Sequence, residues 1–280
     1  MGRGGAVASE KLLSRSFRLF RFVQEARCRP TRIVKSGGEP KTSPFTSREE
    51  LITLSSWNTE DNWDRLNRAI VRCARCPRLR EHCRQVAKQK RRAFQHWTYW
   101  GRPVPNFGDP AGRLLLVGLA PAAHGANRTG RLFTGDRSGD WLFRALHRAG
   151  YANQPTSESR DDGLCLTDCA ITAVCHCAPP QNRPTREERQ MCQRWLTQTF
   201  DVVPARTIIG LGRIAWDAVI AEARRRGWLS EKPPPFSHGL VVPIRGGRRL
   251  IASYHPSQQN TFTGRLTEAM FDRIFTAARR

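Results

Sequence analysis

Acidic residues and long apolar runs are both scarce in this sequence. No run approaches the roughly 18 apolar residues that a membrane-spanning helix needs, so we expect a soluble protein. The 280-residue chain has only 24 Asp and Glu against 47 Lys and Arg, which gives a formal net charge of +23. Such an excess favours a polyanionic partner, because each phosphate that a basic side chain neutralises releases counterions. The alternative is scattered charge without function, since arginine far outnumbers lysine.

A complete disulfide framework is not expected either. The nine cysteines are an odd number and no signal peptide is recognisable, which favours a reducing compartment. The basic, amphipathic N-terminal segment could be an unstructured DNA-tracking arm, an overlong start or, less favoured, a targeting peptide. Residues 36–47, rich in Gly, Ser, Pro and Thr, are typical of a linker. We expect residues 1–50 to form a basic, disordered extension and residues 51–280 to form one folded domain.

Apolar runs alternate with amphipathic segments over the second half of the chain. Strands are expected at 113–118, 170–175, 207–212, 241–244 and 250–254, and helices at 140–149, 186–200 and 266–278. Thr185 and Glu188 have the spacing of a capping box, which predicts a helix start there. Strands that alternate with helices favour an α/β protein with a parallel sheet, whose ligands bind beyond the carboxyl ends of the strands.

The cysteines include two pairs that suggest a bound metal. Cys73 and Cys76 form a C-x-x-C pair, and Cys177 and Cys192 follow about a hundred residues later. Four thiolates suit a structural zinc or an iron-sulfur cluster, and their spacing does not choose between the two. Cys175 is an alternative to Cys177 as the third ligand. The four cysteines could instead be ordinary buried thiols that bind no metal.

Three segments together resemble the motifs of a known family. GLAPAAHGANRTGRLFTGDRSG (118–139), CAPPQNRPTREE (177–188) and YHPSQQNTFTGRLT (254–267) are similar to those of the uracil-DNA glycosylase superfamily, specifically its family 5, from about residue 72 to the C-terminus. The resemblance implies a three-layer α/β/α sandwich with a central four-stranded parallel sheet. It also implies that Cys73, Cys76, Cys177 and Cys192 hold a [4Fe-4S] cluster with a structural role.

The activity implied by the resemblance is base excision repair. Such an enzyme extrudes a base from DNA and hydrolyses the N-glycosidic bond, leaving an abasic site. Its substrates would be uracil and other deaminated or damaged bases, hypoxanthine among them. Relatives with a narrow uracil preference carry Asn where this chain has Ala173, which predicts a permissive pocket. No lysine nucleophile lies in these motifs, so lyase activity is not expected.

The resemblance also assigns the catalytic groups. Asp136 would hold the attacking water, Asn182 would be a second group that orients it, and His255 would donate a hydrogen bond to the departing base. Each has a bland alternative: Asp136 could cap the next helix, and a lone histidine at a strand end is more often structural.

Other residues would bind the nucleotide. Gly118 and Ala120 carry little or no side chain, so a flipped nucleotide could approach the backbone, although a tight turn without a ligand is the alternative. Phe133 would stack on the base and Ser257 would contact the DNA. Asn127 and Arg128 are candidate phosphate contacts.

The expected protein is therefore a cytoplasmic, nucleoid-associated bacterial monomer that binds damaged DNA. The competing hypothesis is a non-catalytic, zinc-containing nucleic-acid-binding protein. Charge and cysteines fit both, but Asp136, Asn182 and His255 on three separate loops favour the enzyme.

Overall fold

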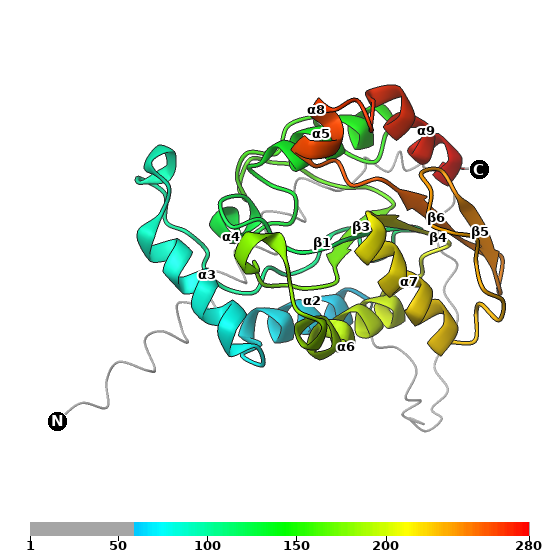
Figure 1. Cartoon of the computed structure of the whole chain (residues 1–280), viewed down its shortest axis with the longest axis horizontal. Coiled ribbons are helices and arrows are strands. Elements are labelled where there is room, and N and C mark those ends of the chain that lie inside the picture. Colours follow the sequence, from blue (N-terminus) through cyan, green and yellow to red (C-terminus); the bar gives the residue numbers. More distant parts are fainter. Residues whose placement is uncertain (1–58, 280) are drawn as a thin grey trace, which may run out of the picture. The chain divides into compact units, whose positions relative to one another are not determined.

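Six strands form one sheet in the computed structural model, which describes residues 59–279 (Figure 1). The extension expected at residues 1–50 lies outside the described residues. The strand order is β1-β3-β2-β4-β6-β5. The strands are β1 (Phe107–Gly108), β2 (Leu114–Gly118), β3 (Cys169–Ala173), β4 (Thr207–Leu211), β5 (Val241–Ile244) and β6 (Arg248–Ser253).

The α/β class is confirmed, but the sheet has six strands instead of the expected four. The four central strands, β3, β2, β4 and β6, are parallel, and an antiparallel strand lies at each edge. β5 is antiparallel because a three-residue turn joins it to β6, too short for a crossover. β1 has only two residues, so it leaves no apolar run to be recognised in the sequence.

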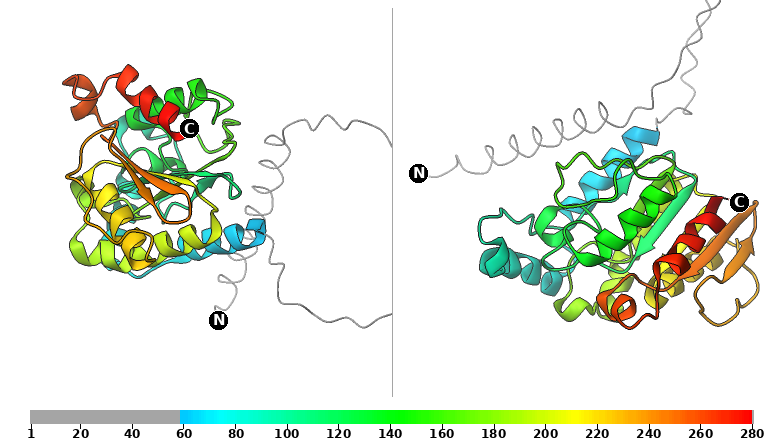
Figure 2. Two further views of the ribbon diagram at one scale, coloured as in Figure 1. Left: turned by 90° about the vertical axis from the view of Figure 1, so that its right-hand side faces the viewer. Right: turned by 90° about the horizontal axis from the view of Figure 1, so that it is seen from above.

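Helices cover both faces of this sheet (Figures 1 and 2). Leu114 and Leu116 of β2 pack in the core beneath α5 and α9, whereas Leu115 and Val117 pack toward α2, α6 and α7. The alternation follows from the strand, because successive side chains point to opposite faces. The longer helices are α2 (Thr59–Arg72), α3 (Pro77–Gln89), α5 (Arg137–Arg148), α6 (Arg186–Val202), α7 (Arg213–Arg225) and α9 (Glu268–Arg279).

Local signals in the sequence explain several helix boundaries. The capping box is confirmed at the start of α6: the Thr185 hydroxyl accepts from the Glu188 N–H, and the Glu188 carboxylate accepts from the Thr185 N–H. Shorter helical segments are η1 (Arg92–Phe94), α4 (Ala126–Thr129), η2 (Pro180–Asn182) and α8 (Gln258–Phe262). Among the described residues, none of the helices has the length and apolar character needed to cross a bilayer.

The topology places the expected motifs at one edge of the sheet. Gly118 at the end of β2 is paired with Ala173 at the end of β3, and Leu211 of β4 with Ser253 of β6. Because these four strands are parallel, the loops that follow them all leave from their carboxyl edge. These are the loops that carry the expected catalytic residues.

Candidate active site and cysteine cleft

Phe133 occupies the space beside Gly118 at the end of β2. A Cβ atom at position 118 would lie 2.8 Å from Cζ of Phe133, so only glycine leaves room for this ring. Phe133 itself has a φ of 53°, in the left-handed region that non-glycine residues rarely adopt. Such backbone strain costs about 1–3 kcal/mol and is concentrated at functional sites. The chain therefore holds Phe133 in place at an energetic cost.

His255, which follows β6, stacks with Phe133. Their ring centroids lie 6.0 Å apart and their planes make an angle of 29°. Loss of hydration lowers the pKa of His255 to about 4, so the imidazole is neutral at neutral pH. Among the described residues, its ring nitrogens have no hydrogen-bond partner. A half-buried, neutral imidazole thus keeps a donor available to a ligand.

Asp136 lies three residues after Phe133 and caps α5. Its Oδ1 accepts from the Gly139 N–H at 3.0 Å, while its Oδ2 faces Gly125, where a Cβ atom would collide with it. Burial raises the pKa of Asp136 above its usual value, although hydrogen bonds from the Gly139 and Ser138 N–H groups oppose this. The capping alternative is therefore correct as geometry. It does not exclude catalysis, because the half-buried carboxylate also lies beside the Phe133 turn.

Arg128 organises the same turn, and the expectation that it contacts phosphate is wrong. Arg128 is 3% exposed and Asn127 is fully buried. The Arg128 guanidinium donates to the His124 carbonyl at 2.7 Å and to the Gly135 carbonyl at 3.0 Å. It thereby fixes the residue just before Asp136. Sequence reasoning missed this role because an arginine in a polar loop of a basic protein is usually solvated.

Two other predicted residues are not brought into this group by any described contact. Asn182 is exposed in η2 with a φ of 58°, and no described contact joins it to Asp136 or His255. Ser257 caps α8 by accepting from the Asn260 N–H at 3.4 Å. Ala120 is half-buried between β2 and α4. The contacts therefore join Gly118, Phe133 and His255, with Asp136 close along the chain.

The four predicted cysteine ligands line a single cleft. Cys73 follows α2, Cys76 immediately precedes α3, Cys177 follows β3 and Cys192 lies within α6. A bidentate ion pair from Arg78 to Glu188, with both N–O distances 2.8 Å, joins the first turn of α3 to that of α6. The fold thus gathers thiols that are distant in sequence.

The chemistry of this cleft fits a cationic centre with sulfur ligands. Burial, together with the neighbouring Cys192 and Cys73, raises the pKa of Cys76 to about 11. Several thiolates could share the cleft only if a positive centre offset their repulsion, as zinc or iron does. In the described part of the chain, no three His, Cys, Asp or Glu side chains are close enough to share a single metal ion. Cys175 does not line the cleft, although Cys192 is the main influence that raises the pKa of its thiol.

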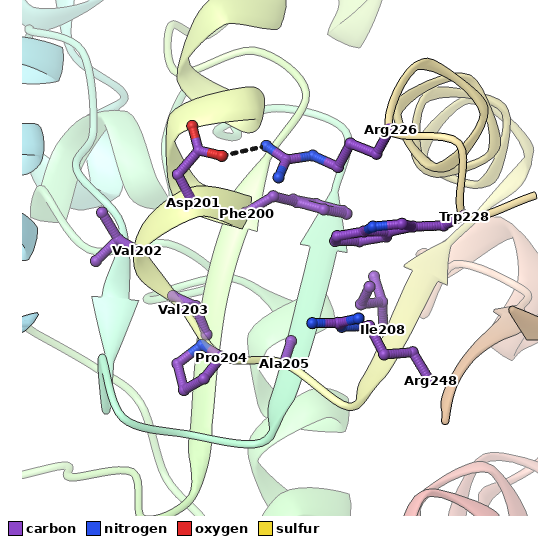
Figure 3. Close-up of a pocket in the computed structure, with 10 residues that line it drawn as sticks. All are labelled: Phe200, Asp201, Val202, Val203, Pro204, Ala205, Ile208, Arg226, Trp228 and Arg248. Carbon is purple, nitrogen blue, oxygen red and sulfur yellow. Dashed lines mark hydrogen bonds and ion pairs between the residues drawn. The ribbon is translucent and has the colours of Figure 1, made fainter. Parts of the chain in front are cut away.

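A larger cleft, of about 300 Å³, lies at the opposite edge of the sheet (Figure 3). Phe200 and Trp228 stack there with centroids 6.0 Å apart, and Arg226 and Arg248 lie against the Trp228 ring. Arg226 is ion-paired with Asp201 at 2.6 Å. None of the expected catalytic residues lines this cleft.

Comparisons with known proteins identify the family of this chain. The model of the uracil DNA glycosylase superfamily matches residues 105–279. A type-5 uracil-DNA glycosylase of Mycobacterium leprae is 52% identical over 77% of this chain and 93% of its own length. The type-5 enzyme of Thermus thermophilus is 48% identical over 75% of this chain and 94% of its own. A type-4 uracil-DNA glycosylase of Pyrobaculum aerophilum is 29% identical over 69% of this chain and 82% of its own. With its parallel sheet and the motifs on the carboxyl edge, the chain belongs to the uracil-DNA glycosylase superfamily.

Proposed function

We propose that the protein is a monofunctional DNA glycosylase that hydrolyses the bond between uracil and deoxyribose and leaves an abasic site. The observation that carries this proposal is the stacked pair of Phe133 and neutral His255, with Asp136 in the same turn as Phe133. The similarity to type-5 uracil-DNA glycosylases supports uracil as substrate. A non-catalytic zinc protein would have no use for this strained group of residues.

The stacked pair leaves room for a base. The Phe133 and His255 ring centroids lie 6.0 Å apart, which is farther than in a face-to-face stack, so the two rings overlap only in part. Part of the Phe133 face therefore extends beyond the imidazole. A flipped base stacks on that part of the ring, in the same layer as His255, and presents its edge to the imidazole N–H.

Bond cleavage builds positive charge on the sugar and negative charge on the base. The neutral His255 N–H stabilises the departing base anion by a hydrogen bond, without having to transfer a proton. Asp136 acts on the other side: its carboxylate accepts a proton from the water whose oxygen bonds to C1′ of the sugar, and its charge stabilises the sugar cation. The raised pKa of Asp136 makes this carboxylate a stronger base than one in water. Asn182 is our candidate for a second group that orients the water.

Cys73, Cys76, Cys177 and Cys192 would hold a [4Fe-4S] cluster. When bound, the cluster supplies a covalent link between α2, α3, the loop after β3 and α6, and takes no part in the cleavage. The Arg78–Glu188 ion pair holds the first turns of α3 and α6 together from the protein side.

Ala173 supports a wider substrate range. It lies beside Gly118 at the carboxyl edge of the sheet, and its methyl group cannot hydrogen bond to the edge of a base. Loss of such paired hydrogen bonds removes about 1–3 kcal/mol of discrimination. We therefore include hypoxanthine among the substrates, with Ser257 as a DNA contact and the bacterial nucleoid as the place of action. The enzyme would act as a monomer, which sedimentation can check.

The activity is tested by incubating the protein with a duplex that carries one uracil. The expected result is release of free uracil, and strand breaks that appear only after alkali. Duplexes with thymine or hypoxanthine at the same position test specificity. Protein that binds the uracil duplex and never releases the base would overturn the proposal.

A further inference from the structure

We propose that a basic finger, residues 88–97, grips the phosphate backbone of the DNA duplex beside the flipped base. The finger comprises the end of α3, the turn η1 and the residues just after it. The inference rests on the proposed function, because it takes DNA as the partner of the neighbouring site. It adds a contact surface that none of the family motifs contains.

The charge of the finger is concentrated and unbalanced. Residues 82–108 include no Asp or Glu. The side chains of Lys88, Arg91 and Arg92 are exposed, and none of them has a carboxylate partner within the described residues. The acidic residue that most closely precedes the finger in the sequence, Glu81, is already paired with Arg84 at 2.7 Å. Three such cations within five residues favour a polyanionic partner, because each phosphate that they neutralise releases condensed counterions.

The finger is rigidly attached to the loop that carries the catalytic turn. Immediately after it, the Trp100 N–H donates to the Arg128 carbonyl at 2.9 Å, and the Gly101 N–H donates to the Asn127 carbonyl at 3.0 Å. The Arg128 guanidinium lies against the rings of Phe94 and Trp97, 3.9 and 4.0 Å from their centroids. The same guanidinium binds the Gly135 carbonyl beside Asp136.

Its position suits a duplex that is already engaged by the site. Figures 1 and 2 show the end of α3 and the following turn projecting from the body beyond α4, the helix of the site loop. A nucleotide rotated into the site remains joined to flanking phosphates, which must pass over the adjoining surface. Aromatic side chains hold the finger in place, so little conformational entropy remains to be lost when its cations meet the backbone.

The finger is tested with the triple variant Lys88→Gln, Arg91→Gln, Arg92→Gln in the full chain. A matched control carries Arg206→Gln, Arg224→Gln and Arg245→Gln, three exposed arginines at the opposite edge of the sheet. Both variants lose three charges, so a general loss of electrostatic attraction affects them equally. Binding to an undamaged duplex is measured by fluorescence anisotropy over a series of salt concentrations, which makes the readout independent of base release.

We expect the finger variant to bind at least about tenfold more weakly, and its plot of log K against log salt to become shallower by about 2 to 3. The control should keep a slope close to that of the unmodified protein. Equal slopes in the two variants would overturn the inference. A finger variant that binds DNA as tightly as the unmodified protein, but binds an acidic protein more weakly, would also overturn it. If the finger variant alone loses slope and the unmodified protein releases no uracil, the finger stands and the proposed activity fails.

Discussion

Replacing Asp136 by Asn and by Ala separates catalysis from helix capping. Asn and Asp cap helices about equally well, so Asp136→Asn keeps the acceptor for the Gly139 N–H, whereas Asp136→Ala removes it. Neither replacement can take a proton from water. If the carboxylate is catalytic, both variants lose activity. If it only caps α5, only Asp136→Ala impairs the protein.

The two replacements should change the thermal stability of the protein in opposite directions. The pKa of Asp136 is raised above 3.8 in the folded protein, so its contribution to the free energy of unfolding is complete below the unfolded pKa and is lost as pH rises through the folded pKa. At neutral pH the buried carboxylate is therefore a cost that Asn removes. We expect Asp136→Asn to unfold at the same or a higher temperature at pH 7, with the difference vanishing in acid. Asp136→Ala should lose about 1 kcal/mol with the cap, or about 2–4 °C in Tm.

The assay is single-turnover release of uracil from a duplex, measured beside thermal unfolding of each variant. General-base catalysis contributes about 10²–10⁴-fold, so both variants should slow the reaction by that factor. Full activity in Asp136→Asn would refute the catalytic role and leave Asp136 as a helix cap. Loss of activity together with a large fall in Tm would show instead that the turn had collapsed.

Three further predictions concern the residues around this carboxylate. His255→Ala should slow uracil release by about 10²-fold or more because the base anion loses its donor, and the unmodified enzyme should lose activity in acid as the Asp136 carboxylate, whose pKa is raised, takes up a proton; single-turnover rates that stay constant into acid would contradict the general-base role. Cys177→Ser should lose brown colour, iron and sulfide in elemental analysis, whereas Cys175→Ser, outside the cleft, should keep them; the reverse result would exchange their roles. Arg128→Lys should lower the single-turnover rate at saturating DNA with little change in KM, since lysine cannot bind both carbonyls; rescue of the Ala variant by Lys would contradict that positioning role.

The sequence predicted the central layer well because its signals are local. The apolar runs of β2, β3, β4 and β6 and the capping box of α6 each need only neighbouring residues to be recognised. The antiparallel edge position of β1 was not predictable, because two residues give no period and pairing with β3 is a long-range event. The helix cap that the sequence offered as the alternative role of Asp136 is present, because Asp is favoured just before a helix.

Contacts between distant segments were beyond the sequence. Arg128 became a buried link between the Gly135 carbonyl and two aromatic rings, although its neighbours suggested an exposed phosphate contact. Nothing local distinguishes such an arginine from a solvated one, since the rings that cover it lie about thirty residues earlier. Likewise, the stacking of Phe133 on His255 joins two loops that eight helices and strands separate along the chain.

The glycines of the site leave space for the protein's own functional side chains. Three functional groups each lie against a glycine: Phe133 against Gly118, Asp136 against Gly125 and His255 against Gly212. A Cβ at any of these glycines would meet the functional side chain before it met a ligand. The bare first half of the loop after β2 is therefore required by the polar second half, which folds back onto it. The room for a flipped base is what remains once those side chains are in place, so a glycine-to-alanine change should act by displacing a catalytic group rather than by blocking the nucleotide directly.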